Sequence, residues 1–240
     1  MKASKELKRI SRENLMGHYR LSMGAFLITF LIPLMIELPF SMLLDTEYAT
    51  SFQRILFLLA EFFISILAGM LQIGLYKFHL SMARHQPYGR SQVFYCFRNH
   101  SEKYVLGYLI ALLINLIGLA PAIGAYFVFS NNPTSPDYLL LAGLCILSLL
   151  LSVVITLTWQ FTFCVMLDNE DLNVLKCFRT ARKLMRGNKL KLLYLYLSFI
   201  GMELLVVISL GVGALWVNPY RLQTMTNFYL ELYSSFDEYV

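Results

Sequence analysis

The sequence from Tyr138 to Leu167 reads YLLLAGLCILSLLLSVVITLTWQFTFCVML and contains no charged side chain. A transmembrane α-helix needs about 20 consecutive apolar residues, so this stretch is long enough to cross a bilayer. Strands of a membrane β-barrel alternate apolar and polar residues over about ten positions, and that alternation is absent here. Helices of a soluble core keep a polar face and seldom run this long. The stretch therefore predicts a membrane-spanning helix.

Four further stretches share this character, and they lie at 21–44, 55–76, 104–129 and 192–217. Over the whole chain 58% of residues are hydrophobic and 15% are charged, whereas soluble domains have about 45–50% and about 25%. This composition excludes a soluble domain, a disordered chain, a disulfide scaffold and a coiled coil. We therefore expect an all-α, polytopic membrane protein. It should form one integral membrane domain over 1–240, with about five transmembrane helices at 21–44, 55–76, 104–129, 138–167 and 192–217.

The basic residues predict how the chain is oriented. All Lys and Arg residues except Arg54 and Arg221 fall in the alternate segments 1–20, 77–103 and 168–191. Because cytoplasmic loops carry the excess of Lys and Arg, we expect the N-terminus in the cytoplasm and, after five crossings, the C-terminus outside. The net charge of +5 then reflects orientation, and no nucleic-acid partner is expected, because the basic surface would press against the bilayer.

An apolar stripe opposes a basic stripe at helical spacing in residues 172–186. The apolar stripe consists of Val174, Phe178, Ala181 and Met185. The basic stripe consists of Lys176, Arg179, Lys183 and Arg186. This pattern is typical of a helix that lies in the membrane interface, and its cations predict contacts with anionic lipid headgroups on the cytoplasmic side. The alternative is that these charges only set the topology.

Similar reasoning predicts four interfacial segments, at 1–20, 84–102, 170–189 and 220–237. The last is amphipathic without being basic and is rich in aromatic residues, so we expect it on the outer surface. Two short matches also suggest a degenerate internal repeat of an interfacial helix followed by two crossings. Val93–Arg98 echoes Val174–Arg179, and Arg9, Arg12 and Gly17 match Arg179, Arg182 and Gly187. Chance similarity in a compositionally biased chain is the alternative.

Four polar residues within the spans form the candidate intramembrane site: Glu37, Glu61, Asn115 and Glu203. A charge at bilayer depth is costly, so each Glu is a functional hypothesis. Glu37 and Glu61 have similar depths in adjacent spans and are predicted to touch; Glu203 and Asn115 form a second depth-matched set. Gln72 and Gln160 lie nearer the cytoplasmic side. The alternative is that these residues only form interhelical hydrogen bonds.

Motifs for catalysis or for metals are absent. The four cysteines form no C-x-x-C pair, and the four histidines have no metal-ligand spacing. No catalytic or phosphate-binding motif is present. We therefore expect no disulfide, no metal, no cofactor and no enzymatic activity.

The last third of the chain resembles a family of bacterial integral membrane proteins catalogued as domain of unknown function 975. The matching residues are Arg179-Thr-Ala-Arg182-Lys-Leu-Met185-Arg-Gly187-Asn-Lys189, Leu197-Ser-Phe-Ile-Gly201, Gly211-Val-Gly213-Ala-Leu-Trp216-Val-Asn-Pro219-Tyr220 and Phe228-Tyr229. Leu15-Met-Gly17-His-Tyr19 is similar to the opening of that family. The chain departs from the family where Met202 and Glu203 follow Gly201 in place of a common Trp, which puts a shared role for Glu203 in doubt. The resemblance implies a multi-pass protein of the bacterial plasma membrane and supplies no activity.

The leading hypothesis is a non-enzymatic accessory or scaffold protein that contacts lipid, a membrane protein partner or a second copy of itself. The alternative hypothesis is a small-molecule or lipid transporter that uses the candidate intramembrane site. An intramembrane enzyme ranks third, because no motif favours it.

Overall fold

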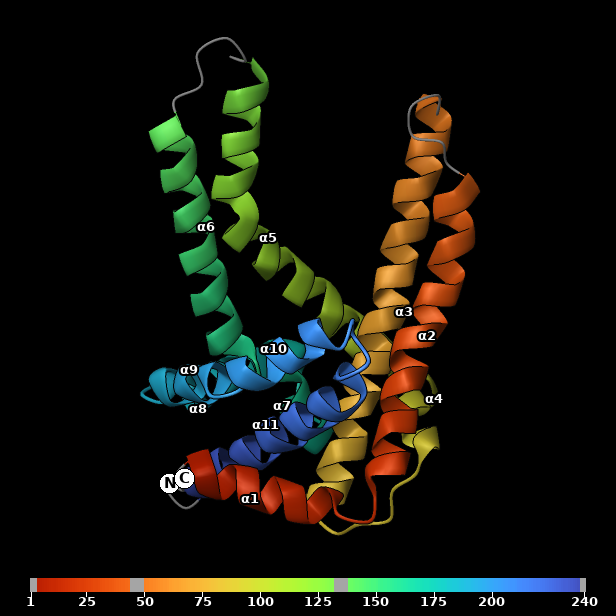
Figure 1. The fold of residues 1–240 in the computed structure, drawn as a ribbon, viewed down its shortest axis with the longest axis vertical. Coiled ribbons are helices and arrows are strands. Elements are labelled where there is room, and N and C mark those ends of the chain that lie inside the picture. The colour runs from red at the N-terminus through yellow and green to blue at the C-terminus, as the bar shows by residue number, and fades with distance from the viewer. Residues whose placement is uncertain (1–3, 44–49, 132–137, 238–240) are drawn as a thin grey trace.

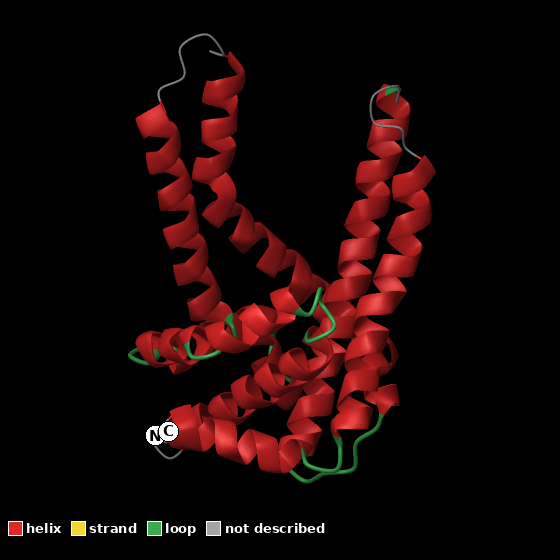
Figure 2. Cartoon of the chain, in the orientation of Figure 1, coloured by secondary structure: helices red, strands yellow, loops and turns green. Residues whose placement is uncertain are grey.

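The computed structural model describes residues 4–43, 50–131 and 138–237, and all regular elements within these ranges are helical (Figure 2). Four long helices stand as two hairpins: α2 (Tyr19–Leu43) with α3 (Ser51–Ala83), and α5 (Ser101–Asn131) with α6 (Tyr138–Trp159) (Figure 1). Five segments are long and apolar enough to cross a membrane: Tyr19–Ser41, Ser51–Ala83, Ser101–Phe127, Tyr138–Asp168 and Lys189–Ile208. These observations confirm the expected all-α fold with about five such segments.

The two hairpins diverge from a shared lower end, so that they form a V in Figure 1. Helices α3 and α5 meet in the lower half of α3, where a Cβ atom on Gly69 would lie 2.2 Å from Cε2 of Tyr108. In the upper halves, apolar side chains are exposed on both hairpins; Phe63 of α3 is 66% exposed and Ile117 of α5 is 64% exposed. Among the described residues, the hairpins therefore pack on each other mainly near their lower ends.

A layer of further helices runs across the lower ends of the hairpins (Figure 1). It consists of α1 (Ser4–Leu15), η1 (Arg90–Phe94), α4 (Tyr95–Arg98), α7 (Thr162–Asp168), α8 (Val174–Leu184), α9 (Lys189–Leu197), α10 (Ile200–Ile208) and α11 (Ala214–Asp237). We call these helices the base layer. The hydrophobic core lies here, where the base layer surrounds the buried lower part of α3 from Met70 to Met82.

Glycine at position 74 lets the base layer approach α3. A Cβ atom at Gly74 would lie 1.9 Å from the carbonyl oxygen of Val93, which is a backbone atom of η1. No side chain fits into that distance, so the packing of η1 on α3 requires a residue without a Cβ atom.

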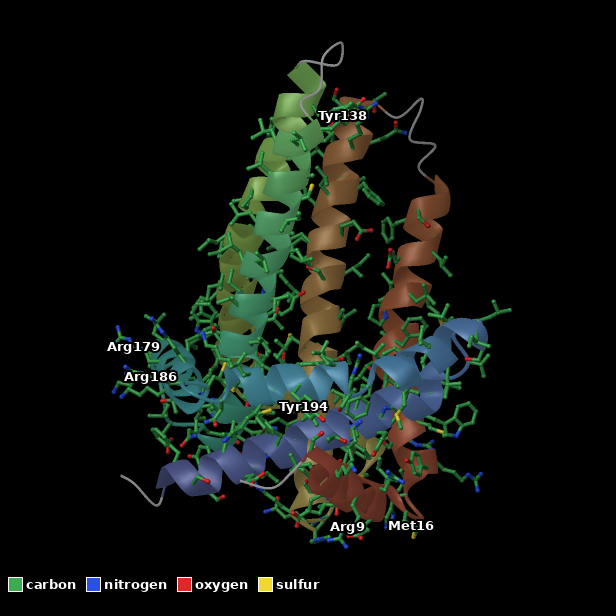
Figure 3. The ribbon with its side chains drawn as sticks, turned by 60° about the vertical axis from the view of Figure 1, so that its left-hand side comes forward. Arg9, Met16, Tyr138, Arg179, Arg186 and Tyr194 are labelled. Carbon is green, nitrogen blue, oxygen red and sulfur yellow. The ribbon has the colours of Figure 1, made fainter. Side chains whose placement is uncertain are left out.

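The fifth apolar segment differs in geometry from the other four. The predicted span 192–217 is divided among α9, α10 and the start of α11. Helices α9 and α10 run across the long helices in both Figure 1 and Figure 3. The chain then reverses at Leu210 and Gly211, whose φ angles of 51° and 91° are left-handed. The left-handed residues end α10, and the chain turns back so that α11 lies beneath α10 (Figure 1).

Helix α11, which contains the C-terminal segment expected on the outer surface, packs on α1. Asn227 Nδ2 donates to Ser11 Oγ at 2.8 Å, and Asn14 Nδ2 donates to Asn227 Oδ1 at 3.4 Å. Two residues on the polar side of α11, Gln223 and Asn227, are buried, and His79 Nδ1 of α3 donates to Gln223 Oε1 at 2.7 Å. Residues 220–237 therefore lie in the core of the base layer, at the same end of the molecule as α1 (Figure 1).

The apolar stripes predicted to enter the membrane interface are covered by protein. Val174, Phe178, Ala181 and Met185 of the α8 region are at most 6% exposed. Leu7 and Leu15 of α1 are buried as well. In the predicted interfacial segment 84–102, only the short elements η1 and α4 are helical before α5 begins, and Val93 and Cys96 are buried. The amphipathic pattern correctly located helices with one buried face, but neighbouring helices, not lipid, bury that face.

The suspected repeat has a counterpart in the order of the elements. Three times a short helix leads through a residue with left-handed φ into a longer or paired helix: Gly17 between α1 and α2, His100 between α4 and α5, and Gly187 between α8 and α9. Their φ angles are 79°, 47° and 82°. Cys96 and Cys177, which correspond in the two matching sequences, are both fully buried.

Candidate intramembrane cavity

A polar cavity lies where the two hairpins meet. It has a volume of about 200 Å³ and is lined by residues of α3, α5, α6, α7 and α8. Its walls carry aromatic and aliphatic side chains, among which stand the polar groups of Gln72, Tyr76, Asn115, Gln160 and Thr162. The cavity combines apolar walls with a few polar groups, as small-molecule sites do.

The polar groups of this cavity are only partly paired. Gln160 Nε2 donates to Tyr76 Oη at 3.4 Å, and Asn115 Nδ2 donates to the carbonyl oxygen of Ala111 at 2.8 Å. The hydroxyl of Thr162 is buried and has no hydrogen-bond partner among the described residues. Buried polar groups normally have partners, so an unpaired hydroxyl at this cavity leaves capacity for a water molecule or a ligand.

The structure brings one of the four predicted intramembrane residues, Asn115, to this cavity. Glu37 and Glu61 lie in the upper part of the α2–α3 hairpin, away from its walls, and no hydrogen bond joins these two described residues. Glu203 lies on α10 and has no contact with Asn115. The predicted polar site therefore does not assemble. Gln72 and Gln160, which the sequence located near the cytoplasmic side, take part instead.

Glu203 has an ionic partner that the sequence did not indicate. Arg221 Nη1 of α11 donates to Glu203 Oε1 at 2.6 Å, while its Nη2 donates to Asn218 Oδ1 at 2.9 Å. The two side chains are 41% and 36% exposed. Sequence reasoning placed Arg221 outside the bundle, because it treated 192–217 as one crossing; the reversal at Leu210 and Gly211 brings the two residues together.

A second polar network connects helices of the base layer to the lower end of α3. Arg84 donates through Nη1 and Nη2 to both oxygens of Asp168, each at 2.7 Å, and Tyr229 Oη donates to Asp168 Oδ2 at 2.7 Å. These hydrogen bonds raise the pKa of the Arg84 guanidinium. The network joins the ends of α3 and α7 to α11, and no local pattern in the sequence pairs these residues.

The predicted lipid-contact residues are all exposed: Lys176, Arg179 and Lys183 lie on α8, and Arg186 follows the end of that helix. Arg179 and Arg186 lie at the outer edge of the base layer (Figure 3). The opposite face of α8 is buried against the protein, so the helix presents its cations outward. This arrangement allows contact with anionic headgroups without insertion of the helix into lipid.

No group of His, Cys, Asp and Glu in the described ranges could hold a metal ion. Burial raises the pKa of the Cys96 thiol to about 12 and also raises the pKa of Cys177. Thiolates are the reactive form of cysteine, so these two buried thiols act as small apolar side chains.

A family model described as "Protein of unknown function (DUF975)" matches residues 1–235. No curated protein and no solved structure matches the chain.

Proposed function

Because the chain belongs to the DUF975 family, whose description names no activity, we propose a function from the structure: a non-enzymatic scaffold protein of the bacterial plasma membrane. The scaffold would contact lipid and a membrane partner, which is another protein or a second copy of this chain. The observation that carries the proposal is the V of two hairpins, whose upper apolar faces have few contacts with each other. In a bilayer, either lipid or a helix of a partner would cover these exposed apolar faces.

The proposed orientation follows from charge. Every Lys and Arg of the described residues except Arg54 belongs to the base layer or to the lower ends of the long helices. Under the positive-inside rule the base layer then faces the cytoplasm, and the N-terminus is cytoplasmic as expected. Because α11 packs on α1, we also propose a cytoplasmic C-terminus and four crossings, by α2, α3, α5 and α6.

Helices α9 and α10 would then lie along the inner membrane surface. Leu190 and Leu197 of α9 are exposed and lie seven positions apart, so they share one face, and Leu204 of α10 is exposed as well. A helix in the interface places such a face in the boundary between headgroups and acyl chains. This position gives the fifth apolar segment contact with lipid without a crossing.

A small-molecule or lipid transporter is the second candidate, and the polar cavity favours it. The transported molecule would bind between Gln72, Asn115 and Gln160. The candidate carboxylates do not support this function, because Glu37, Glu61 and Glu203 are not in the cavity wall. Transport requires that the cavity open in turn to each side of the membrane, whereas a scaffold does not need this.

Access to the cavity distinguishes the two candidates without knowledge of a substrate. Thr156 lies in the cavity wall. The test replaces it by cysteine, whose side chain is of similar size, in a variant that lacks the native cysteines. For a scaffold, we expect a membrane-impermeant maleimide to label this cysteine from one side at most. Labelling both in intact cells and in inside-out vesicles would favour the transporter. Ser51→Cys and Arg186→Cys, at opposite ends of the molecule, control for sidedness.

A further inference from the structure

A second cavity lies at the outer edge of the base layer, between α5, α6 and α8. Its volume is about 190 Å³, and its walls are Ile110, Ile114, Trp159, Leu175, Phe178, Arg179 and Arg182. The four residues from α8 are spaced i, i+3, i+4 and i+7, so one stripe of the helix faces the α5–α6 hairpin.

The two ends of this cavity differ in chemistry. The side toward the long helices is apolar and is formed by Ile110 and Ile114 of α5. The side toward α8 includes Arg179 and Arg182, whose side chains are exposed and form no ion pair with a described residue, so that their guanidinium groups are free to meet a ligand at the cavity mouth. Guanidinium groups bind phosphate oxygens in a bidentate manner, and two of them next to each other form a site for one phosphate.

Trp159 also lines this cavity. It ends α6 and is half-buried in the cavity wall. Tryptophan concentrates at the level of lipid headgroups, because its ring is apolar and its N–H group is polar. In the orientation proposed above, Trp159 thus marks the depth at which a phosphate on the cytoplasmic side would meet Arg179 and Arg182.

We infer that this cavity is a binding site for one anionic phospholipid. Arg179 and Arg182 hold its phosphate, and Ile110 and Ile114 contact the first part of an acyl chain. Two unpaired cations favour a headgroup with net negative charge, such as that of phosphatidylglycerol, over a zwitterionic one. The apolar wall favours a lipid over free phosphate. The inference rests on the proposed function, because it requires the base layer to lie at the membrane surface.

The test uses the purified full-length protein in detergent, titrated with phosphatidylglycerol and observed by native mass spectrometry. The double variant Arg179→Gln/Arg182→Gln should weaken binding of the first lipid by about 30-fold. The matched control is Lys176→Gln/Lys183→Gln, which removes two exposed cations from the same helix but from outside the cavity wall. It should change the affinity less than about three-fold, because detergent micelles provide no continuous anionic surface.

Two further arms identify the source of the phosphate and the role of the apolar wall. Neither phosphatidylcholine nor inorganic phosphate should displace the bound phosphatidylglycerol at equal concentration. Ile110→Trp fills the cavity without a change in charge and should lower the occupancy by the lipid, while the thermal midpoint shows whether the protein still folds. Equal effects of the two glutamine variants, or displacement by inorganic phosphate, would overturn the lipid site.

Failure of this site and failure of the scaffold function have different signatures. If the arginine variant binds phosphatidylglycerol normally and Thr156→Cys is labelled from one side only, the scaffold stands and the lipid site falls. If Thr156→Cys is labelled from both sides while the arginine variant loses the lipid, the lipid site is supported, but the protein is a transporter and the scaffold function is contradicted.

Discussion

At the scale of single residues, the surroundings of the acidic side chains separate structural from surface roles. Asp168 is 7% exposed in its side chain and accepts three hydrogen bonds, from Arg84 and Tyr229. Glu203 is 41% exposed and has one ionic partner. A charge pair with a buried member costs much when it is broken, because the remaining charge lacks both its partner and full hydration. An exposed pair contributes little.

We therefore predict losses of stability that differ in size for two chemically similar substitutions. Asp168→Asn should lower the stability by about 2 kcal/mol, which corresponds to a fall of the thermal midpoint by about 4–8 °C. Glu203→Gln should cost less than about 1 kcal/mol. Thermal unfolding of both variants in the same detergent measures the difference. Equal midpoints would show that the Asp168 network does not fasten the base layer.

At the scale of elements, the short amphipathic helices act as packing units of the base layer. Helices α1 and α8 bury their apolar faces on other helices, and each leads through a left-handed glycine into the next helix. The sequence correctly identified one buried face per helix. The partner of that face was mistaken, because the periodicity of apolar residues is the same whether lipid or protein covers them.

The contact between α3 and η1 provides the sharpest element-scale prediction. Gly74→Ala would place a Cβ atom on the carbonyl oxygen of Val93, and a backbone group cannot move aside as a side chain can. We expect the variant to lose most of the monodisperse protein in size-exclusion chromatography. Gly143→Ala on α6 is the matched control, since a Cβ atom there meets nothing within 4 Å. Its thermal midpoint should stay the same or rise. A normal yield of Gly74→Ala would contradict the close approach.

At the scale of the whole molecule, the packing of α11 on α1 supports the topology proposed above. Helix α11 is buried between α1 and the lower part of α3, with Gln223 bonded to His79 and Asn227 bonded to Ser11. In the orientation proposed above, this packing places the C-terminus on the same side as the N-terminus and requires four crossings.

Reporter fusions test this arrangement. Green fluorescent protein fused after Val240 should fluoresce, and alkaline phosphatase at the same position should be inactive, because both results indicate the cytoplasm. Alkaline phosphatase inserted after Thr134, between α5 and α6, should be active and serves as the opposite control. An active C-terminal phosphatase would restore five crossings and contradict a cytoplasmic α11.

The sequence by itself determined that the chain is helical, rich in apolar segments and polarised in charge, because each property is local. A run such as Tyr138–Leu167 satisfies its backbone hydrogen bonds within one helix, and its lipid compatibility depends only on its own side chains. The tertiary structure alone decided the rest. It showed that α11 lies on α1, that Glu203 pairs with Arg221, and that Asn115, Gln72 and Gln160 share a cavity. These contacts join residues that are far apart in the chain, and they depend on the turn at Leu210 and Gly211 and on the close packing at Gly69 and Gly74. A periodic pattern shows that one face of a helix is apolar, but it does not encode which distant segment packs on that face.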